Sequence, residues 1–201
     1  MKKILVIIWL IFLFSGVAAL FWYNELIYQL PTPVPENYKP VNQGQLIKLS
    51  GTLSANYDKP LFLHFFNPDC PCSRFNISNF KSLVRQYGRQ MNFVVIVMNN
   101  KRYSAKEVQA KFGLDIPVFF DTSVAVSCGV YSTPQAVLID TQHKLYYRGN
   151  YNKSRYCTDE KTNYARMAIV GLLHDHARVT FDKLALRAYG CSLPNCSKWR
   201  N

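Results

Sequence analysis

The 201-residue sequence offers no support for several common kinds of catalytic site. It shows no glycine-rich phosphate loop, no carboxylate pair arranged for acid–base catalysis and no Ser-His-Asp arrangement. Acidic residues are few, 12 against 24 basic ones, and the formal net charge is +12. The basic residues are scattered and no nucleic-acid motif is present, so we expect no nucleic-acid partner. This charge instead suits a protein that lies near an anionic membrane surface.

Charge is absent from residues 4–23, which follow Met1-Lys2-Lys3. Twenty helical residues at ~1.5 Å each span ~30 Å, the hydrocarbon core of a bilayer. We therefore expect residues 1–3 to be cytoplasmic and residues 4–23 to be a retained signal anchor. A cleaved signal peptide is the competing interpretation, because Val17-Ala18-Ala19 offers small residues for cleavage. Either way the rest is exported, so we expect a single-pass inner (cytoplasmic) membrane protein with its C-terminal domain in the periplasm or outside.

The exported part divides into three predicted segments. Residues 24–45 hold four prolines among polar residues and predict a semi-extended linker that keeps a domain off the membrane. Hydrophobic residues make up 49% of the chain, enough for a packed core, which we place in residues 46–177. Residues 178–201 then form a cysteine-containing C-terminal extension.

The domain is expected to be organised around residues 65–75, where two cysteines follow a strand. The apolar, aromatic-rich run at residues 61–66 predicts a buried strand. Residues 67–69 read Asn-Pro-Asp and predict a turn. A helix over residues 72–88 follows, because its apolar residues recur on one face.

This arrangement places a thiol at a helix N-terminus. Cys70 is predicted at the N-cap, Pro71 at the first helical position and Cys72 at the second. The first amides of a helix lack intrahelical acceptors and carry partial positive charge, which stabilises a thiolate. Arg74 adds positive charge nearby, whereas Asp69 opposes it. Two cysteines that merely pack or form a structural bridge are the competing interpretation.

Further elements follow from apolar periodicity, caps and turn residues. The predicted strands cover residues 92–98, 117–120, 135–140 and 145–148, and the predicted helices cover residues 104–112, 121–128 and 162–173. Two peripheral elements are also expected, a first strand at residues 46–49 and a tail helix over residues 178–189.

The element order β-α-β-α-β-β-α, with a cysteine pair after the first core strand, resembles the thioredoxin fold. In particular the chain resembles the membrane-anchored, TlpA- and ResA-like thioredoxins of bacterial envelopes. Three stretches carry the resemblance: residues 65–72, residues 129–140 and residues 145–149. It covers roughly residues 46–176 and implies an α/β, thioredoxin-like three-layer sandwich with a central mixed sheet, preceded here by one transmembrane helix.

The resemblance implies roles for four residues. Cys70 would be the exposed attacking thiolate and Cys72 the resolving thiol. Thr133-Pro134 would form a cis peptide bond that faces the cysteines, in a loop whose backbone pairs with a bound substrate. An ordinary turn before a strand is the alternative for Pro134. The expected partners are exported cysteine-containing proteins and a membrane redox partner, and no cofactor is implied.

The chain departs from the family at the cysteine motif. Asp69 replaces the usual tryptophan before the first cysteine, and Pro71 alone separates the two cysteines. This Cys-Pro-Cys form is similar to that of a group of anchored thioredoxin-like proteins. Residues two apart on a helix do not face each other, so a Cys70–Cys72 disulfide would be strained. Alternatively the pair stays open, and Cys128 is then the candidate resolving cysteine.

The remaining cysteines are expected to pair, because export exposes them to an oxidising compartment. We expect a structural Cys157–Cys191 bridge that ties the tail to the domain. A local Cys191–Cys196 loop competes with it, and so does the use of these cysteines as a second redox relay.

Four functions remain open on these residues. An envelope thiol–disulfide oxidoreductase acting through Cys70 and Cys72 is the leading hypothesis. A Cu(I) or other thiolate metal-binding module is the second, although no methionine cluster supports it and His174 and His176 are poorly spaced for a metal site. A peroxiredoxin fits poorly, because Asn67 stands where its threonine belongs. A non-catalytic thioredoxin-like scaffold is the fourth.

Overall fold

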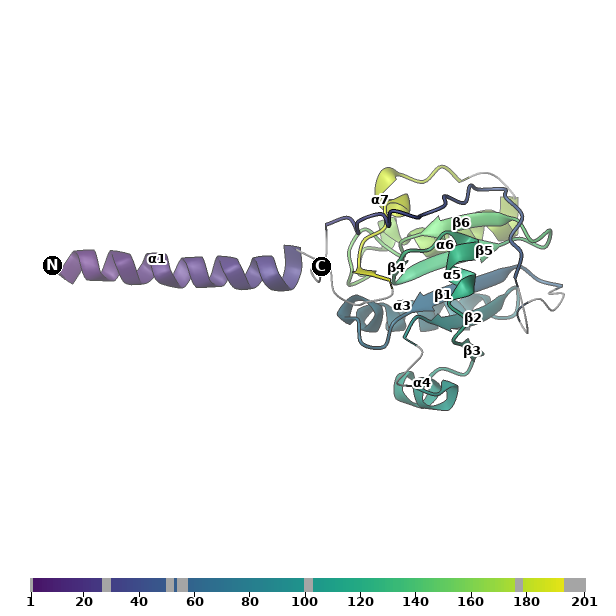
Figure 1. Cartoon of the computed structure of the whole chain (residues 1–201), viewed down its shortest axis with the longest axis horizontal. Coiled ribbons are helices and arrows are strands. Elements are labelled where there is room, and N and C mark those ends of the chain that lie inside the picture. The colour runs from purple at the N-terminus through teal and green to yellow at the C-terminus, as the bar shows by residue number, and fades with distance from the viewer. Residues whose placement is uncertain are drawn as a thin grey trace.

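The computed structural model describes residues 2–26, 30–49, 53, 58–99, 103–175 and 179–193. One long helix, α1 (Lys2–Phe21), projects away from a mixed α/β domain that holds all the strands (Figure 1). α1 continues as a π-helical turn at Trp22–Leu26.

The central sheet has five strands in the order β3-β2-β1-β5-β6. β1 (Leu61–Phe66) lies parallel to β2 (Asn92–Val97), and β2 lies parallel to β3 (Val118–Phe119). On its other side β1 pairs antiparallel with β5 (Gln135–Ile139), which pairs antiparallel with β6 (Leu145–Gly149). The sheet is therefore mixed, as predicted, and β1 is its middle strand, buried at every position.

Helices cover both faces of the sheet, giving the expected three layers. α3 (Pro71–Tyr87), α4 (Ala105–Phe112) and α6 (Tyr164–Val170) contribute side chains to the core on one face. α5 (Ser123–Cys128) packs on the opposite face. A 3₁₀ turn at Glu160–Thr162 precedes α6, and a π-helical turn at Gly171–Asp175 follows it.

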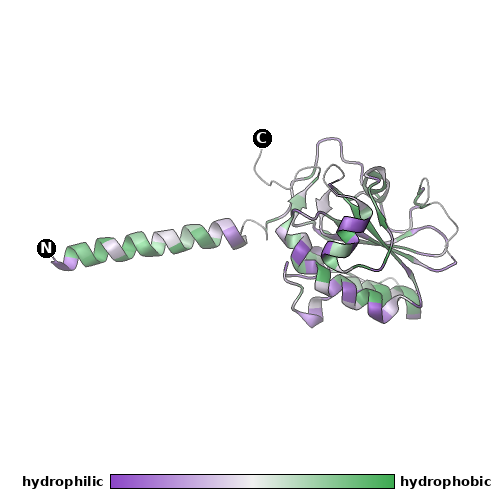
Figure 2. Cartoon of the chain, turned by 90° about the horizontal axis from the view of Figure 1, so that it is seen from below, coloured by the Kyte–Doolittle hydropathy of each residue, from purple (hydrophilic) through white to green (hydrophobic). Residues whose placement is uncertain are grey.

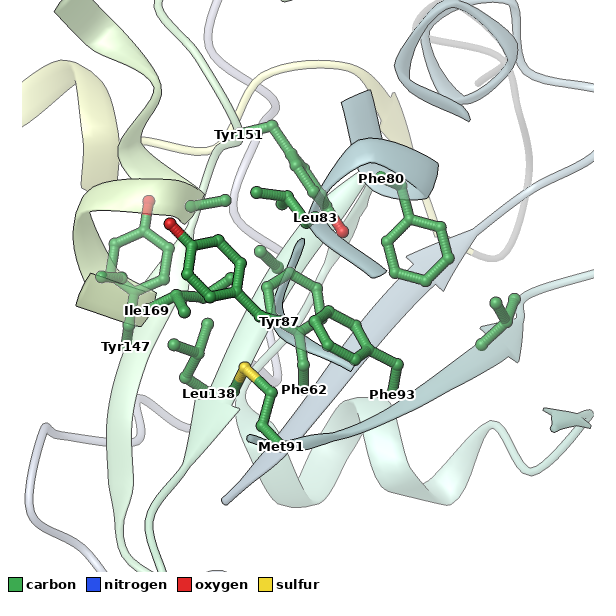
Figure 3. Close-up of a cluster of buried hydrophobic side chains, with 14 of the residues drawn as sticks. Phe62, Phe80, Leu83, Tyr87, Met91, Phe93, Leu138, Tyr147, Tyr151 and Ile169 are labelled. Atoms are coloured by element: carbon green, nitrogen blue, oxygen red, sulfur yellow. The ribbon is translucent and has the colours of Figure 1, made fainter. Parts of the chain in front are cut away.

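Aromatic side chains fill the core between β1 and α3 (Figure 3). The ring of Phe62 stacks on Phe93 with centroids 5.0 Å apart and lies tilted against Phe80 and Tyr151, at 6.0 Å from each. Aromatic pairs in such arrangements stabilise by ~0.5–1.5 kcal/mol beyond the area they bury. At the other end of β1, where the cysteine motif begins, Phe66 lies edge-on to Phe112 with ring centroids 4.9 Å apart.

α1 has no buried residue and is apolar along its length (Figure 2). Residues 2–24 are long and apolar enough to cross a membrane, a property that a signal sequence shares. The helix is thus the expected candidate for a membrane span.

The predicted linker packs on the domain instead of standing free. The Thr32 amide donates to the Ala188 carbonyl over 2.9 Å, and the Tyr38 hydroxyl donates to the Gly129 carbonyl over 3.0 Å. Val41 and Ile47 join the core beneath α5. The strand predicted at residues 46–49 does not form, because Leu46 makes only an isolated bridge to Lys144.

The C-terminal extension also packs on the domain. Its helix, α7 (Lys183–Leu186), is shorter than predicted. The chain then runs extended into β7 (Cys191–Ser192), which pairs antiparallel with β4 (Ser132–Thr133) in a small second sheet. The described part of the extension, residues 179–193, is therefore held on the domain.

Candidate functional site

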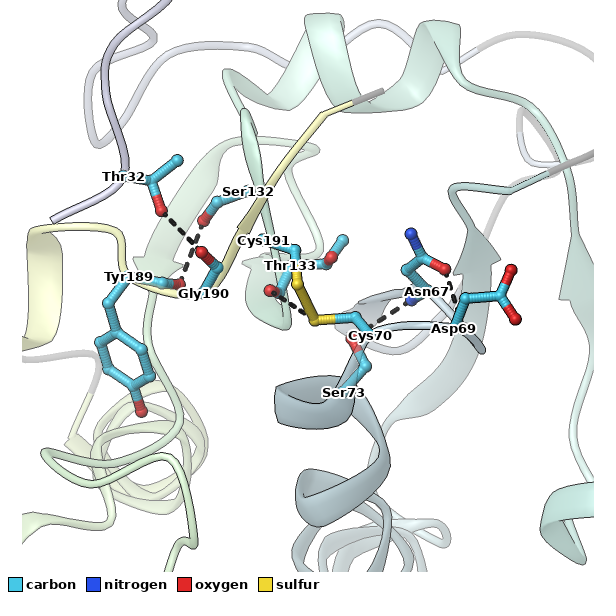
Figure 4. Close-up of a disulfide and its surroundings, with 10 residues drawn as sticks. All are labelled: Thr32, Asn67, Asp69, Cys70, Ser73, Ser132, Thr133, Tyr189, Gly190 and Cys191. Carbon is cyan, nitrogen blue, oxygen red and sulfur yellow. Dashed lines mark hydrogen bonds between the residues drawn. A yellow bond between two sulfur atoms is a disulfide. The ribbon is translucent and has the colours of Figure 1, made fainter. Parts of the chain in front are cut away.

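The turn after β1 presents Cys70 at the start of α3, as predicted (Figure 4). Cys70 is the N-cap and Pro71 occupies the first turn. The Cys70 amide donates to the Asn67 carbonyl over 3.0 Å, and the Asn67 amide donates to the Ser73 hydroxyl over 3.3 Å. These bonds close the Asn-Pro-Asp turn and hold the first cysteine in place.

Asp69 is held away from the cysteines by the loop after β2. Its carboxylate accepts hydrogen bonds from the Asn99 side-chain amide and from the Tyr103 hydroxyl, the latter at 2.8 Å. Its own amide donates to the Asn67 side chain over 3.0 Å. The negative charge that the sequence sets beside Cys70 is thus engaged on a neighbouring loop.

The partner of Cys70 is Cys191, and this corrects two expectations. A disulfide joins the two residues, whose Cα atoms are 6.5 Å apart, within the normal range for such bonds (Figure 4). The predicted Cys157–Cys191 bridge is wrong, because β7 carries Cys191 to the start of α3. Cys70 is also fully buried rather than exposed, since the tail lies over it.

The peptide segment around Cys191 lies against Thr133-Pro134, whose peptide bond is cis as the resemblance implied. Thr133 is the register partner of Cys191. The Cys70 sulfur lies 3.9 Å from the Thr133 carbonyl oxygen. Gly190 has φ +113°, and a Cβ there would overlap that same oxygen, so only glycine fits this close approach.

Hydrogen bonds from the loop after β6 and from the N-terminal segment anchor the tail. The Asn150 side-chain amide donates to the Leu184 and Arg187 carbonyls, each over 2.7 Å. The Tyr189 hydroxyl donates to the Asn152 carbonyl over 2.7 Å. From the N-terminal side, the Thr32 hydroxyl donates to the Gly190 carbonyl over 3.3 Å (Figure 4).

Cys72 lies with the disulfide, while two other cysteines lie apart from it. Cys70, Cys72 and Cys191 pack in one buried cluster, and Cys72 keeps its thiol. Cys128 belongs to the core on the α5 face, and burial raises the pKa of its thiol to about 12. Burial likewise raises the pKa of Cys157 to about 12, and its thiol donates to the Asn76 side chain over 3.3 Å.

His64 is a fully buried histidine within β1. Its ring stacks on Phe80 with centroids 4.2 Å apart, and its Nδ1 is 2.7 Å from the Tyr151 hydroxyl oxygen. Burial lowers the pKa of His64 from 6.5 to about 3, so the imidazole is neutral at physiological pH. Its Nε2 has no hydrogen-bond partner among the described residues.

An open cavity of about 770 Å³ lies beside the end of β7. Leu193, Tyr131, Tyr38, Met98 and Asn99 are among its lining residues. Within the described ranges, no group of three or more His, Cys, Asp or Glu side chains is placed to hold a metal ion. His176 and Cys196 fall outside those ranges, so the predictions that involve them are not addressed.

The sequence did not predict two features of the site. One is the pairing of Cys191 with Cys70, and the other is the clamp on the tail, the two hydrogen bonds from the Asn150 side chain. A partial signal exists for the first, because Gly190 directly precedes the cysteine and allows a close backbone approach. No local pattern marks Asn150, since its partners lie more than thirty residues away in the chain.

Solved structures with similar backbones place this arrangement in the thioredoxin-like fold. A hypothetical protein from Sinorhizobium meliloti 1021 matches with a TM-score of 0.62 at 19% identity, over 78% of this chain and 96% of its own. An uncharacterized conserved protein from Geobacillus kaustophilus matches with a TM-score of 0.60 at 20% identity, over 82% of this chain and 94% of its own. A putative thiol:disulfide interchange protein DsbE from Chlorobium tepidum matches with a TM-score of 0.54 at 18% identity, over 67% of this chain and 99% of its own.

Within that fold class, the chain belongs to a defined family. Residues 40–193 match the domain of unknown function DUF6436, so the protein is a member of the DUF6436 family. The match begins inside the predicted linker and ends just after β7, which agrees with the packing of both segments on the domain. A comparison with curated protein sequences finds no match.

Proposed function

We propose that the protein is a thiol–disulfide oxidoreductase in which Cys70 is the exchanging cysteine. The observation that carries the proposal is the Cys70–Cys191 disulfide at the N-terminus of α3, against the Thr133-Pro134 peptide. A thiol at a helix N-terminus is stabilised as the thiolate, the form that attacks a disulfide. Cys70 is the cysteine of the pair that occupies this position.

The overall reaction exchanges one disulfide for one dithiol. A client thiolate attacks the Cys70 sulfur, the Cys70–Cys191 bond breaks with Cys191 leaving as a thiolate, and a mixed disulfide forms between the client and Cys70. A second client thiolate then attacks the mixed disulfide on the client side and releases the reduced site. The client loses two electrons and two protons, and the site gains the two electrons. The same steps run backwards when a client disulfide is reduced.

The proposed setting is the outer side of the inner membrane. α1 would anchor the chain with its N-terminus in the cytoplasm, because Lys2 and Lys3 precede the apolar run. The domain would then meet exported cysteine-containing proteins, and a membrane redox partner would restore its starting state. The net charge of +12 would favour approach to anionic lipid headgroups.

A disulfide-exchange assay on the full-length protein in detergent tests the proposal. Insulin reduction by dithiothreitol and oxidation of a reduced, unfolded client cover both directions. We expect the Cys70→Ser variant to fall to the uncatalysed rate in whichever direction the parent works. Cys128→Ser is the matched control and should retain the parent rate, because Cys128 lies in a different part of the core. Equal rates for Cys70→Ser and the parent would remove the proposed activity.

A further inference from the structure

The tail occupies the place that a client peptide would take in the proposed reaction. Its strand β7 pairs with β4 through the register Thr133↔Cys191 and Ser132↔Ser192, and the Leu193 amide donates to the Tyr131 carbonyl over 3.1 Å. Its cysteine is bonded to the sulfur of Cys70. The chain thus holds one of its own extended segments where the exchanging cysteine meets a partner strand (Figure 4).

We propose that Cys191 is a third redox-active cysteine, which resolves the mixed disulfide between Cys70 and a client. This inference rests on the proposed function of Cys70. β7 leaves β4 when a client strand binds there and returns as Cys191 displaces the client from Cys70. The tail is then a working part of the site, and the Cys70–Cys191 bond is the oxidised product of a cycle.

The anchoring of the tail keeps Cys191 within reach throughout such a cycle. Asn150 holds the Leu184 and Arg187 carbonyls, so the segment that must move begins after Arg187. The bonds from Thr32 and from the Tyr189 hydroxyl must open when it moves. Three residues separate Arg187 from Cys191, and the four Cα–Cα steps between them span at most about 14 Å. A thiol on so short a tether has a high effective concentration at Cys70, which favours attack by Cys191.

Cys72 is the competing resolving thiol, and its position disfavours direct attack on Cys70. It lies two residues along α3, and side chains two apart on a helix point in different directions. The structure accordingly keeps the thiol of Cys72 beside the disulfide while Cys70 is bonded to the tail. A cysteine brought in by a separate strand has no such constraint.

The steps balance for the reduction of a client disulfide. The Cys70 thiolate attacks one client sulfur, the client S–S bond breaks, and the second client sulfur leaves as a thiolate. The Cys191 thiolate then attacks the Cys70 sulfur, the mixed disulfide breaks, and the first client sulfur also leaves as a thiolate. The client gains two electrons and takes up two protons from water, while Cys70 and Cys191 supply the electrons and become the disulfide.

A single-turnover experiment on the reduced full-length protein in detergent distinguishes the two resolving thiols. The probe is a fluorescent peptide disulfide, and acid quenching followed by mass spectrometry measures the Cys70–peptide adduct over time. We expect the adduct to last at least tenfold longer in Cys191→Ser than in the parent, with Cys128→Ser as the matched control. An unchanged lifetime in Cys191→Ser overturns the proposal, and a long-lived adduct in Cys72→Ser alone would assign resolution to Cys72.

The same experiment separates this inference from the proposed function. If no variant forms an adduct at Cys70, the proposed function fails and this inference fails with it. If the adduct forms and decays normally without Cys191, only this inference fails. Circular dichroism on each variant checks that the domain keeps its fold.

A glycine variant tests the docking of β7 without removing any cysteine. In Gly190→Ala the new methyl group would overlap the Thr133 carbonyl oxygen, and φ at this position is +113°. We expect an adduct lifetime at least threefold longer than in the parent, because the tail docks less often. Gly44→Ala is the matched control, since Gly44 also has positive φ but a Cβ there meets nothing within 4 Å. A parent-like lifetime in Gly190→Ala would contradict the role of β7.

Discussion

The cysteines of this domain differ in how readily they form a thiolate, because their surroundings differ. Cys70 sits at the first turn of α3, where unpaired amides favour a thiolate. Cys128 is buried in the core and Cys157 is partly buried against it, and burial disfavours the charged form of both thiols. The chemistry of each thiol therefore follows from the element that carries it.

This difference predicts which thiols react after gentle reduction. Burial raises the pKa of both Cys128 and Cys157 to about 12, so almost no reactive thiolate forms at pH 8. We expect iodoacetamide to label Cys70 and Cys191 at least tenfold faster than these two residues, because reduction of their bond lets the tail move off Cys70. Peptide mass spectrometry of the folded protein measures the four rates. Equally fast labelling of Cys128 would contradict the described environment.

His64 predicts a loss of stability in acid. Its folded pKa, about 3, lies below the unfolded value of 6.5, so the unfolded chain binds the proton more tightly. Stability should therefore fall as pH drops from about 6.5 towards 3, by up to ~1.4 kcal/mol per pH unit. Urea unfolding at several pH values measures this slope, and His64→Gln should flatten it. The same slope in both proteins would assign the effect to other groups.

At the scale of elements, the tail depends on Asn150. Its side-chain amide donates hydrogen bonds to the carbonyls of Leu184, in α7, and of Arg187, at the end of α7. Asn150→Ala removes both bonds, and we expect a destabilisation of ~1–3 kcal/mol. The Cys70–Cys191 bond should also become easier to reduce, because the tail docks less firmly.

Chemical denaturation and thiol release against dithiothreitol concentration measure the two effects in Asn150→Ala. Gln142→Ala is a suitable control, since Gln142 is exposed in the β5–β6 turn, far along the chain from the tail. We expect the control to stay within ~0.5 kcal/mol of the parent. An Asn150→Ala protein that matches the control would show that the clamp is unimportant.

The elements that local patterns could predict are those with strong periodicity or clear caps. β1, β2, α3 and α4 were expected within a residue or two, because long apolar runs and residues such as Ser104 and Gly113 mark them. The predictions of a strand at residues 46–49 and of a long tail helix were wrong. Both lie at the periphery, where pairing with distant segments decides the conformation.

The site was predicted only in part for the same reason. The N-cap position of Cys70 and the cis bond at Thr133-Pro134 follow from a local motif and a family resemblance. The partner of Cys70 does not, because 121 residues separate it from Cys191 along the chain. Disulfide pairing is set by the packing of the whole tail, which no local pattern contains.

At the scale of the whole molecule, the N-terminal helix is the candidate membrane anchor. α1 has the length and apolarity of a membrane span but also of a signal sequence. We expect the protein to stay in the membrane fraction after a high-salt wash, and a form without residues 1–29 to be soluble. Intact-mass measurement on the membrane fraction should show the uncleaved chain. A mature form that begins near residue 20 would identify a cleaved signal instead.

The Cys70–Cys191 disulfide joins the proposed exchanging cysteine to the chain's own tail. The most direct test is non-reducing peptide mapping by mass spectrometry, on full-length protein whose thiols are blocked during lysis. We expect a pair of peptides cross-linked through Cys70 and Cys191, with Cys157 recovered as a blocked thiol. Recovery of Cys191 joined to Cys157, with Cys70 absent from any bond to the tail, would contradict it.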